Sequence, residues 1–125
     1  MKKLLLGIVS LFITNQVFAE ESCEKFTTSY DRTYCVAKLF VESDNELNQV
    51  YKELKTYLKS EISKSLTTTQ RNWIKYRDNR CETNGNIEVD CNYQVNKLRT
   101  EYLRDRLREC KTGNCQIDAI RRESW

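Results

Sequence analysis

The chain has 125 residues, with 21 lysines and arginines against 18 aspartates and glutamates, which gives a formal net charge of +3. This length suits one small domain, and a charge so close to balance argues against nucleic-acid binding. The sequence contains no histidine and no glycine-rich phosphate loop. Because these are the usual groups for acid–base and phosphoryl chemistry, we expect no enzymatic activity and no cofactor.

Residues 1–19 have the pattern of an export signal. Lys2 and Lys3 supply the positive start, and the apolar segment of residues 4–13 is too short to span a bilayer. Val17-Phe18-Ala19 is a small-x-small cleavage site. We therefore expect a periplasmic or secreted product without a transmembrane segment, carrying 19 basic and 18 acidic side chains after loss of the two signal lysines.

All six cysteines follow this segment, and an even number in a small exported chain predicts three disulfides. A metal site and a redox site are both disfavoured, because the chain has no histidine and no Cys-x-x-Cys pair. The cysteines are Cys23, Cys35, Cys81, Cys91, Cys110 and Cys115.

Helices should dominate, since the region after the signal has no proline and only two glycines. Residues 30–40 can form a short first helix. From about Ala37 to Ser60, apolar residues recur at steps of three and four, which predicts a second helical segment. Its apolar residues are Phe40, Leu47, Val50, Tyr51, Leu54, Tyr57 and Leu58. The pattern leaves open a kink between the two.

Thr67-x-x-Gln70 resembles a capping box and predicts the start of the next helix. The core side of that helix is expected to carry Gln70, Trp73, Ile74, Arg77 and Cys81. Asn84-Gly85 predicts a turn after it.

Asp90 is expected to cap a further helix, and Gly113 is placed to end it. Residues 114–122 can add one last turn or two. The expected core side of this helix carries Cys91, Val95, Leu98, Tyr102, Leu103, Leu107 and Cys110. Short connections between long helices predict an all-α fold, a small up-and-down bundle of three to four helices stapled by disulfides.

This arrangement favours particular cysteine pairs. Cys81 and Cys91 would lie at the same end of a helical hairpin, Cys110 and Cys115 flank a turn, and Cys23–Cys35 is the remaining pair. The main alternative joins Cys23 to Cys110 and Cys35 to Cys115. All fifteen connectivities stay formally open.

Several spaced residues together resemble a known family. They are Cys23-x11-Cys35, Asp44-x2-Leu47, Val50-Tyr51, Gln70-Arg71-x-Trp73-x3-Arg77-Asp78-x2-Cys81 and Cys91-x7-Arg99-x3-Leu103. In this order they resemble the LprI-type lysozyme-inhibitor domain. The resemblance implies a small exported helical domain over residues 20–109, with structural disulfides and no catalysis. Asn96 stands where a Thr is usual. Residues 110–125, a disulfide-closed turn and C-terminal tail, lie outside the family pattern.

The motif residues allow two interpretations. We favour a semi-buried polar network that fixes the helix register, in which Arg77 needs a carboxylate or amide partner such as Asp44, Asn48 or Asp78. The alternative is a contact surface formed by Trp73, Arg77 and Asp78. The residues concerned are Asp44, Asn48, Tyr51, Gln70, Arg71, Trp73, Arg77, Asp78 and Arg99.

Two exposed regions are candidates for partner contact. One is an acidic patch of Glu42, Asp44 and Glu46 that would suit a basic partner, although we favour the simpler explanation that these charges lie on solvated helix faces. The other is the loop of residues 83–89, because loops on rigid scaffolds often carry recognition. Its candidate contacts are Asn84, Gly85, Asn86 and Glu88.

The leading functional hypothesis is a protein-binding domain that inhibits a lysozyme-type peptidoglycan hydrolase. The alternative is an envelope structural or stress-adaptor module, suggested by the cationic and aromatic tail residues Arg121, Arg122 and Trp125. The simpler explanation of that tail is fraying.

Overall fold

The computed structural model describes residues 23–123, so the signal segment and Trp125 lie outside the described residues. The elements in chain order are α2 (Ser29–Thr56), α3 (Ser60–Arg80), β1 (Glu82–Thr83), β2 (Asn86–Ile87), α4 (Val89–Lys111) and α5 (Ile117–Ile120). The fold is all-α apart from the two-residue strands, and three disulfides staple it, as predicted.

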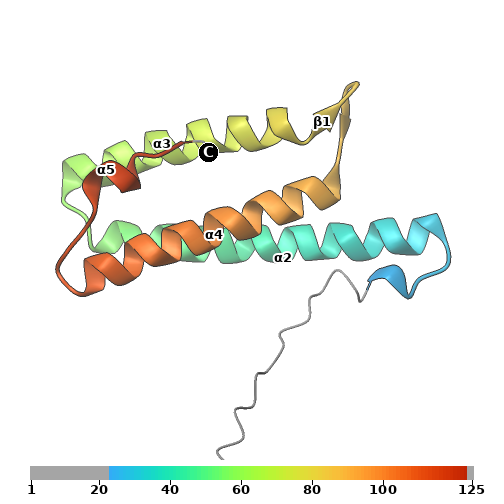
Figure 1. The fold of residues 1–125 in the computed structure, drawn as a ribbon, viewed down its shortest axis with the longest axis horizontal. Coiled ribbons are helices and arrows are strands. Elements are labelled where there is room, and N and C mark those ends of the chain that lie inside the picture. Colours follow the sequence, from blue (N-terminus) through green and yellow to red (C-terminus); the bar gives the residue numbers. More distant parts are fainter. Residues whose placement is uncertain (1–22, 124–125) are drawn as a thin grey trace, which may run out of the picture.

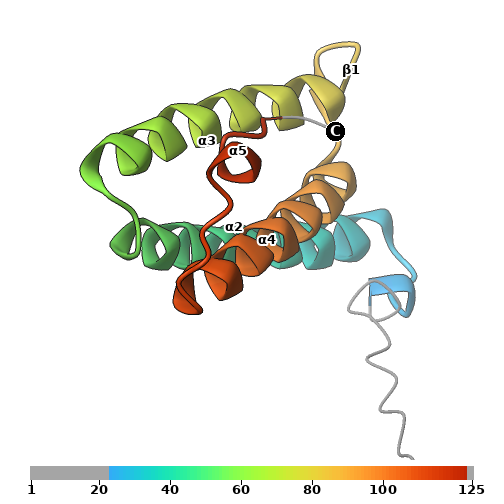
Figure 2. The same cartoon turned by 60° about the vertical axis from the view of Figure 1, so that its left-hand side comes forward.

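The chain reverses direction after each long helix (Figure 1), so α3 runs antiparallel to α2 and α4. As a result α2 and α4 run the same way, and they pack side by side along most of their length. The C-terminal segment with α5 turns back and lies between α3 and α4 (Figure 2). This is the up-and-down bundle expected from the sequence.

Helix α2 is a single helix of 28 residues and not two pieces. Thr28 caps its start, because the Thr28 hydroxyl accepts the backbone N–H of Asp31 at 3.0 Å. No glycine or proline interrupts the segment, and Leu47, Val50 and Leu54 bury one continuous face. The helix ends at Thr56, four residues before the end expected from the apolar pattern.

Helix α3 begins at Ser60, so the capping box expected at Thr67 is wrong. The Thr67 hydroxyl instead donates to the Ser63 carbonyl at 3.1 Å, one helical turn back. Threonine makes this bond inside a helix as readily as it caps one. Ile62 and Leu66 pack into the core upstream of Thr67 and carry the helix through it.

The start of α4 differs from the expectation, whereas its end matches it. Its start is at Val89 with Glu88 at the N-cap position, so Asp90 lies in the first turn and is not the cap. Its end matches the expectation for Gly113, which has a φ of +81°. The Gly113 N–H donates to the Cys110 carbonyl and the Asn114 N–H to the Glu109 carbonyl, both at 3.0 Å. These two bonds form a Schellman motif.

The core lies where the long helices face one another, and α5 adds to it. Its largest buried apolar side chains are Leu47, Leu54, Leu66, Trp73, Leu103 and Ile120. Ile74 and Leu98 were expected in the core but are exposed. Each lies one position beside a residue on the inward side of its helix: Ile74 follows buried Trp73, and Leu98 precedes buried Arg99.

Candidate functional site

Trp73 is fully buried between two guanidinium groups from different helices. The guanidinium carbons of Arg77 and Arg99 lie 5.6 Å and 5.4 Å from the centre of its ring. Cations at this distance over an indole are attracted by its π electrons, more strongly when water is excluded. The family-motif tryptophan is therefore a core residue and is not available as a surface anchor.

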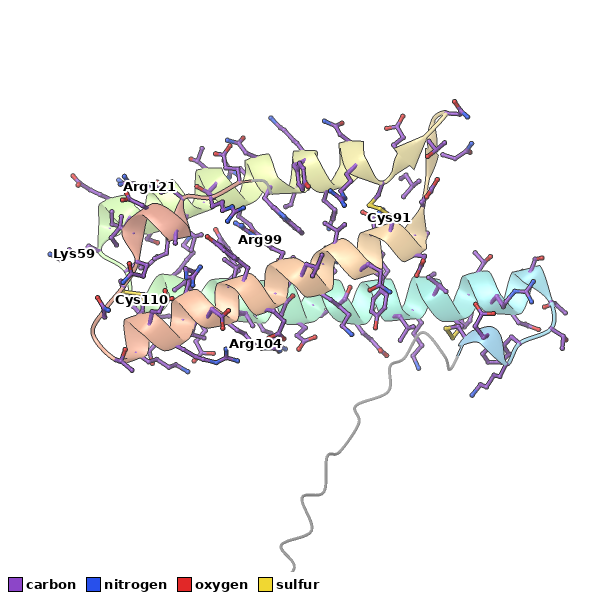
Figure 3. The ribbon with its side chains drawn as sticks, viewed as in Figure 1. Lys59, Cys91, Arg99, Arg104, Cys110 and Arg121 are labelled. Atoms are coloured by element: carbon purple, nitrogen blue, oxygen red, sulfur yellow. A yellow bond between two sulfur atoms is a disulfide. The ribbon has the colours of Figure 1, made fainter. Side chains whose placement is uncertain are left out.

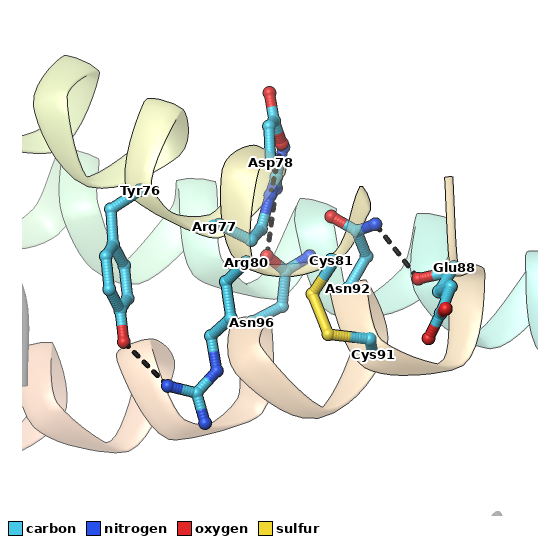
Figure 4. The surroundings of a disulfide bond; sticks show 9 residues. All are labelled: Tyr76, Arg77, Asp78, Arg80, Cys81, Glu88, Cys91, Asn92 and Asn96. Atoms are coloured by element: carbon cyan, nitrogen blue, oxygen red, sulfur yellow. Dashed lines mark hydrogen bonds and ion pairs between the residues drawn. A yellow bond between two sulfur atoms is a disulfide. The ribbon is translucent and has the colours of Figure 1, made fainter. Parts of the chain in front are cut away.

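Arg77 joins all three long helices. Its Nη1 donates to Asn96 Oδ1 of α4 at 3.0 Å and to Asp44 Oδ1 of α2 at 3.3 Å. Its Nε and Nη2 both donate to Asp78 Oδ1, at 2.9 Å and 2.8 Å (Figure 4). Asn96 then donates to Ser43 Oγ at 3.1 Å. A connected network of this kind fixes the register of the helices, because a shift would leave several buried groups unpaired.

Arg99 is the second buried cation, and it points from α4 toward α3 (Figure 3). Its Nε donates to Gln70 Oε1 at 3.1 Å, and its Nη1 donates to the backbone carbonyl of Arg122 at 2.8 Å. Burial lowers the pKa of Arg99 to about 10, against the opposing effect of Tyr102 and Glu123. The guanidinium is thus still charged at neutral pH and holds the tail.

Three further motif residues lie at the edge of this network or away from it. Asn48 is exposed and donates to the network member Asp44, at 3.5 Å. The Tyr51 hydroxyl donates to Thr67 Oγ1 at 3.0 Å, near the start of α3. Arg71 is exposed. Ser43 and Asn96 are members that sequence reasoning missed, and the signals for Asn96 were its place three residues before Arg99 and its departure from the Thr usual in the family pattern.

The three acidic side chains of the expected patch do not share one face. Asp44 faces α3, whereas Glu42 and Glu46 lie one helical turn apart on the side of α4. Asp44 and Glu46 each have a cation within salt-bridge distance. Glu42 has a longer contact of 3.8 Å. The pairs are Glu42–Lys38, Asp44–Arg77 and Glu46–Arg104. These residues therefore do not form an uncompensated acidic patch.

The β1–β2 hairpin projects from one end of the bundle (Figure 1). Asn84 and Gly85 both have positive φ, 54° and 76°, as a two-residue type I′ turn requires. Asn84, Gly85, Asn86 and Glu88 are all exposed, and Ile87 is 73% exposed. Glu82, Glu88 and Asp90 are also exposed, and within residues 23–123 none has a cationic side chain within salt-bridge distance.

The hairpin is held at its base on both sides. A disulfide joins Cys81 to Cys91 (Figure 4), and the Glu88 N–H donates to the Cys81 carbonyl at 2.8 Å. The other two bridges join Cys23 to Cys35 and Cys110 to Cys115. These pairs are the ones preferred from the sequence.

Removing the hairpin disulfide by Cys81→Ala and Cys91→Ala is expected to lower the free energy of unfolding by about 2–4 kcal/mol, because the unfolded chain gains freedom. Urea unfolding followed by circular dichroism measures the loss. Limited proteolysis of the folded variant should also cut first within residues 82–88. Unchanged stability together with unchanged cleavage would show that the disulfide is not what anchors the hairpin.

The C-terminal tail is packed, so the expectation that it frays is wrong for residues 117–123. Ile120 is fully buried, and the Tyr102 hydroxyl donates to the Ala119 carbonyl at 2.6 Å. Asn72 Nδ2 donates to Glu123 Oε1 at 2.8 Å. With the Arg99 contact, these bonds fasten the tail to both α3 and α4.

Neither a cluster of metal ligands nor a membrane-spanning helix is present among residues 23–123. No group of three or more Cys, Asp or Glu side chains there is placed to hold a metal ion. No helix there is long and apolar enough to cross a membrane.

The described residues thus define a small helical scaffold with a buried polar network, three disulfides and an anchored hairpin. The family model for Lysozyme inhibitor LprI matches residues 20–109 of the chain. The match covers well over half of the sequence, and the protein belongs to this family. Searches among curated proteins and among solved structures gave no match.

Proposed function

We propose that this protein is an exported, non-catalytic inhibitor that binds a lysozyme-type peptidoglycan hydrolase. Membership of the lysozyme-inhibitor family over residues 20–109 is the observation that carries the proposal. The three disulfides support a periplasmic or secreted location, because such bonds persist in oxidising compartments. Inhibition of this kind needs a stable surface that covers the enzyme's cleft and no bond-making group.

The hairpin is the contact surface that we favour. Its exposed residues Asn84, Gly85, Asn86 and Glu88 stand on a backbone fixed by the Cys81–Cys91 disulfide, so little conformational freedom is lost on binding. The unpaired carboxylates beside the turn would draw a basic enzyme toward this end of the bundle. The expected acidic patch on α2 is a weaker candidate, because its carboxylates already have cationic partners.

Inhibition is tested with the purified, oxidised protein in a muramidase assay on cell walls. We expect a dose-dependent loss of activity for at least one lysozyme, with Glu88→Lys weakening inhibition about 10-fold and flattening its dependence on salt. Glu61→Lys is the matched control, because Glu61 is an exposed glutamate in the first turn of α3, at the opposite end of the bundle.

The possible outcomes test two claims separately: that the protein inhibits lysozyme, and that the hairpin is the contact surface. If a stoichiometric excess of the protein slows none of several lysozymes, the inhibitor proposal is wrong. If the wild type inhibits and Glu88→Lys inhibits equally well, inhibition stands but the hairpin contact is wrong. The adaptor hypothesis rests on the cationic and aromatic tail residues Arg121, Arg122 and Trp125, and no specific contact among residues 23–123 favours it, so we do not propose it as a second function.

A further inference from the structure

The outward face of the first half of α2 carries an apolar stripe that nothing in the described chain covers. Tyr30, Tyr34 and Val41 are 78%, 68% and 55% exposed, and the partly buried Ala37 lies between them. They lie on the side of the helix opposite the buried face around Leu47. Exposed apolar side chains that line up in this way mark interaction surfaces, whereas single ones need no explanation.

The spacing of the stripe is that of a two-stranded coiled coil. Residues 30, 34, 37 and 41 are separated by steps of four, three and four, which places them at successive d, a, d and a positions of a heptad. The next two positions of the same seam are Asp44 and Asn48, which are polar and bonded to each other at 3.5 Å. The apolar seam therefore runs from Tyr30 to Val41. A seam of this kind packs against an apolar stripe of the same length on another helix.

We propose that this face binds a second copy of the chain, with the two α2 helices antiparallel about a two-fold axis. In an antiparallel pair each a position faces a d position of the other helix. Tyr30 then lies opposite Val41 of the partner subunit, and Tyr34 lies opposite Ala37 of the partner subunit. Each large ring meets a smaller side chain, so the stripe is complementary to itself, as a two-fold interface must be.

The charges beside the seam also select the antiparallel arrangement. Asp31 and Lys38 occupy its e positions, and e positions face each other across an antiparallel pair. Asp31 therefore lies near Lys38 of the partner subunit, and the contact is repeated by symmetry. Among residues 23–123 the acidic partner of Lys38 is exposed Glu42 at 3.8 Å, so Lys38 can turn to the partner subunit at little cost. A parallel pair would place Lys38 beside Thr33 instead.

The proposed dimer is weak, but α2 does not have to fold before it can bind. Helix α2 is already formed, capped at Thr28 and tied to the preceding loop by the Cys23–Cys35 disulfide. The seam contains only four pairs of facing side chains, two Tyr30–Val41 pairs and two Tyr34–Ala37 pairs. They bury far less accessible surface than the roughly 1,200–2,000 Å² of a stable interface. We therefore expect a dimer that forms with a dissociation constant on the order of 10–100 μM.

Sedimentation velocity of the oxidised protein, expressed as the full chain with its own leader, tests this. Across about 5–500 μM the weight-average mass should rise from monomer toward dimer, and Tyr34→Lys should weaken association at least about 10-fold. Leu98→Lys is the matched control, because Leu98 is an exposed leucine on α4 away from the seam. A wild type that stays monomeric at every concentration, or a Leu98→Lys effect as large as that of Tyr34→Lys, would overturn the proposal.

A charge exchange tests the direction of the helices. Lys38→Asp alone should weaken the dimer by repulsion from Asp31 of the partner subunit, and adding Asp31→Lys should restore it. Because Asp31 also bonds to the capping Thr28, circular dichroism must show α2 intact in the double variant.

If the double variant loses helix, the single variants Lys38→Ala and Lys38→Asp are compared instead. The antiparallel dimer requires Lys38→Asp to weaken association more than Lys38→Ala does. If neither Lys38→Asp nor the double variant changes the dissociation constant of the dimer, the antiparallel pairing is wrong.

Discussion

Replacing Trp73 with alanine is expected to lower the free energy of unfolding by about 3–5 kcal/mol, the range seen when a large buried aromatic is removed. Trp73 is fully buried and lies between the guanidinium groups of Arg77 and Arg99. The variant leaves a cavity and also removes the ring from beside two buried cations. Both effects lower the free energy of unfolding.

The Trp73 measurement is urea unfolding followed by the helical circular dichroism signal, since Trp125 complicates fluorescence. Ile74→Ala is the matched control on the neighbouring, exposed position, and it should cost less than about 1 kcal/mol. Trp73→Phe, which keeps a ring, should lose less than Trp73→Ala. A cost below about 1 kcal/mol for Trp73→Ala would mean that this residue is not the centre of the core.

Replacing Ile120 with alanine is expected to cost about 2–5 kcal/mol, although Ile120 lies outside the part of the chain that matches the family. Its side chain is fully buried, and the tail on which it stands accepts hydrogen bonds from Tyr102 and Arg99. When Ile120 no longer holds the tail, these buried donors become exposed to water or lose their partners. The tail is thus part of the folded domain.

The control for the tail is Arg121→Ala, because Arg121 is the exposed neighbour of Ile120. That change should alter the free energy of unfolding by less than about 0.5 kcal/mol. Hydrogen exchange adds a local readout, since the amide protons of Ile120 and Arg121 bond to carbonyls of Gln116 and Ile117. Equal stability of the two variants would contradict a structural role for the tail.

The features that the sequence predicted best are local ones. Asn84-Gly85 forms its turn and Gly113 ends its helix because each requirement is set by the φ angle of one or two residues. The disulfide pairs are also short-range, since each joins neighbouring cysteines of the chain. The inward side of α3 followed from its spacing, with Gln70, Trp73 and Arg77 buried together.

The features that could not be predicted depend on another helix. Thr67 has the spacing of a cap, and only the packing of Leu66 shows that the helix continues through it. The roles of Asn96 and Ser43 depend on the position of Arg77 across the bundle. Likewise the acidic residues of α2 look uncompensated in sequence, because Arg104 and Arg77, which neutralise Glu46 and Asp44, come more than thirty residues later.

The short disulfide spans bear on how the protein matures. The two cysteines of each bridge are 12, 10 and 5 positions apart, and no cysteine lies between the two members of any pair. The contact between α2 and α4, in contrast, cannot form until most of the chain is present. A polypeptide delivered from its amino end into an oxidising compartment can therefore acquire its native cross-links one after another, before the helices assemble and without any later exchange of partners.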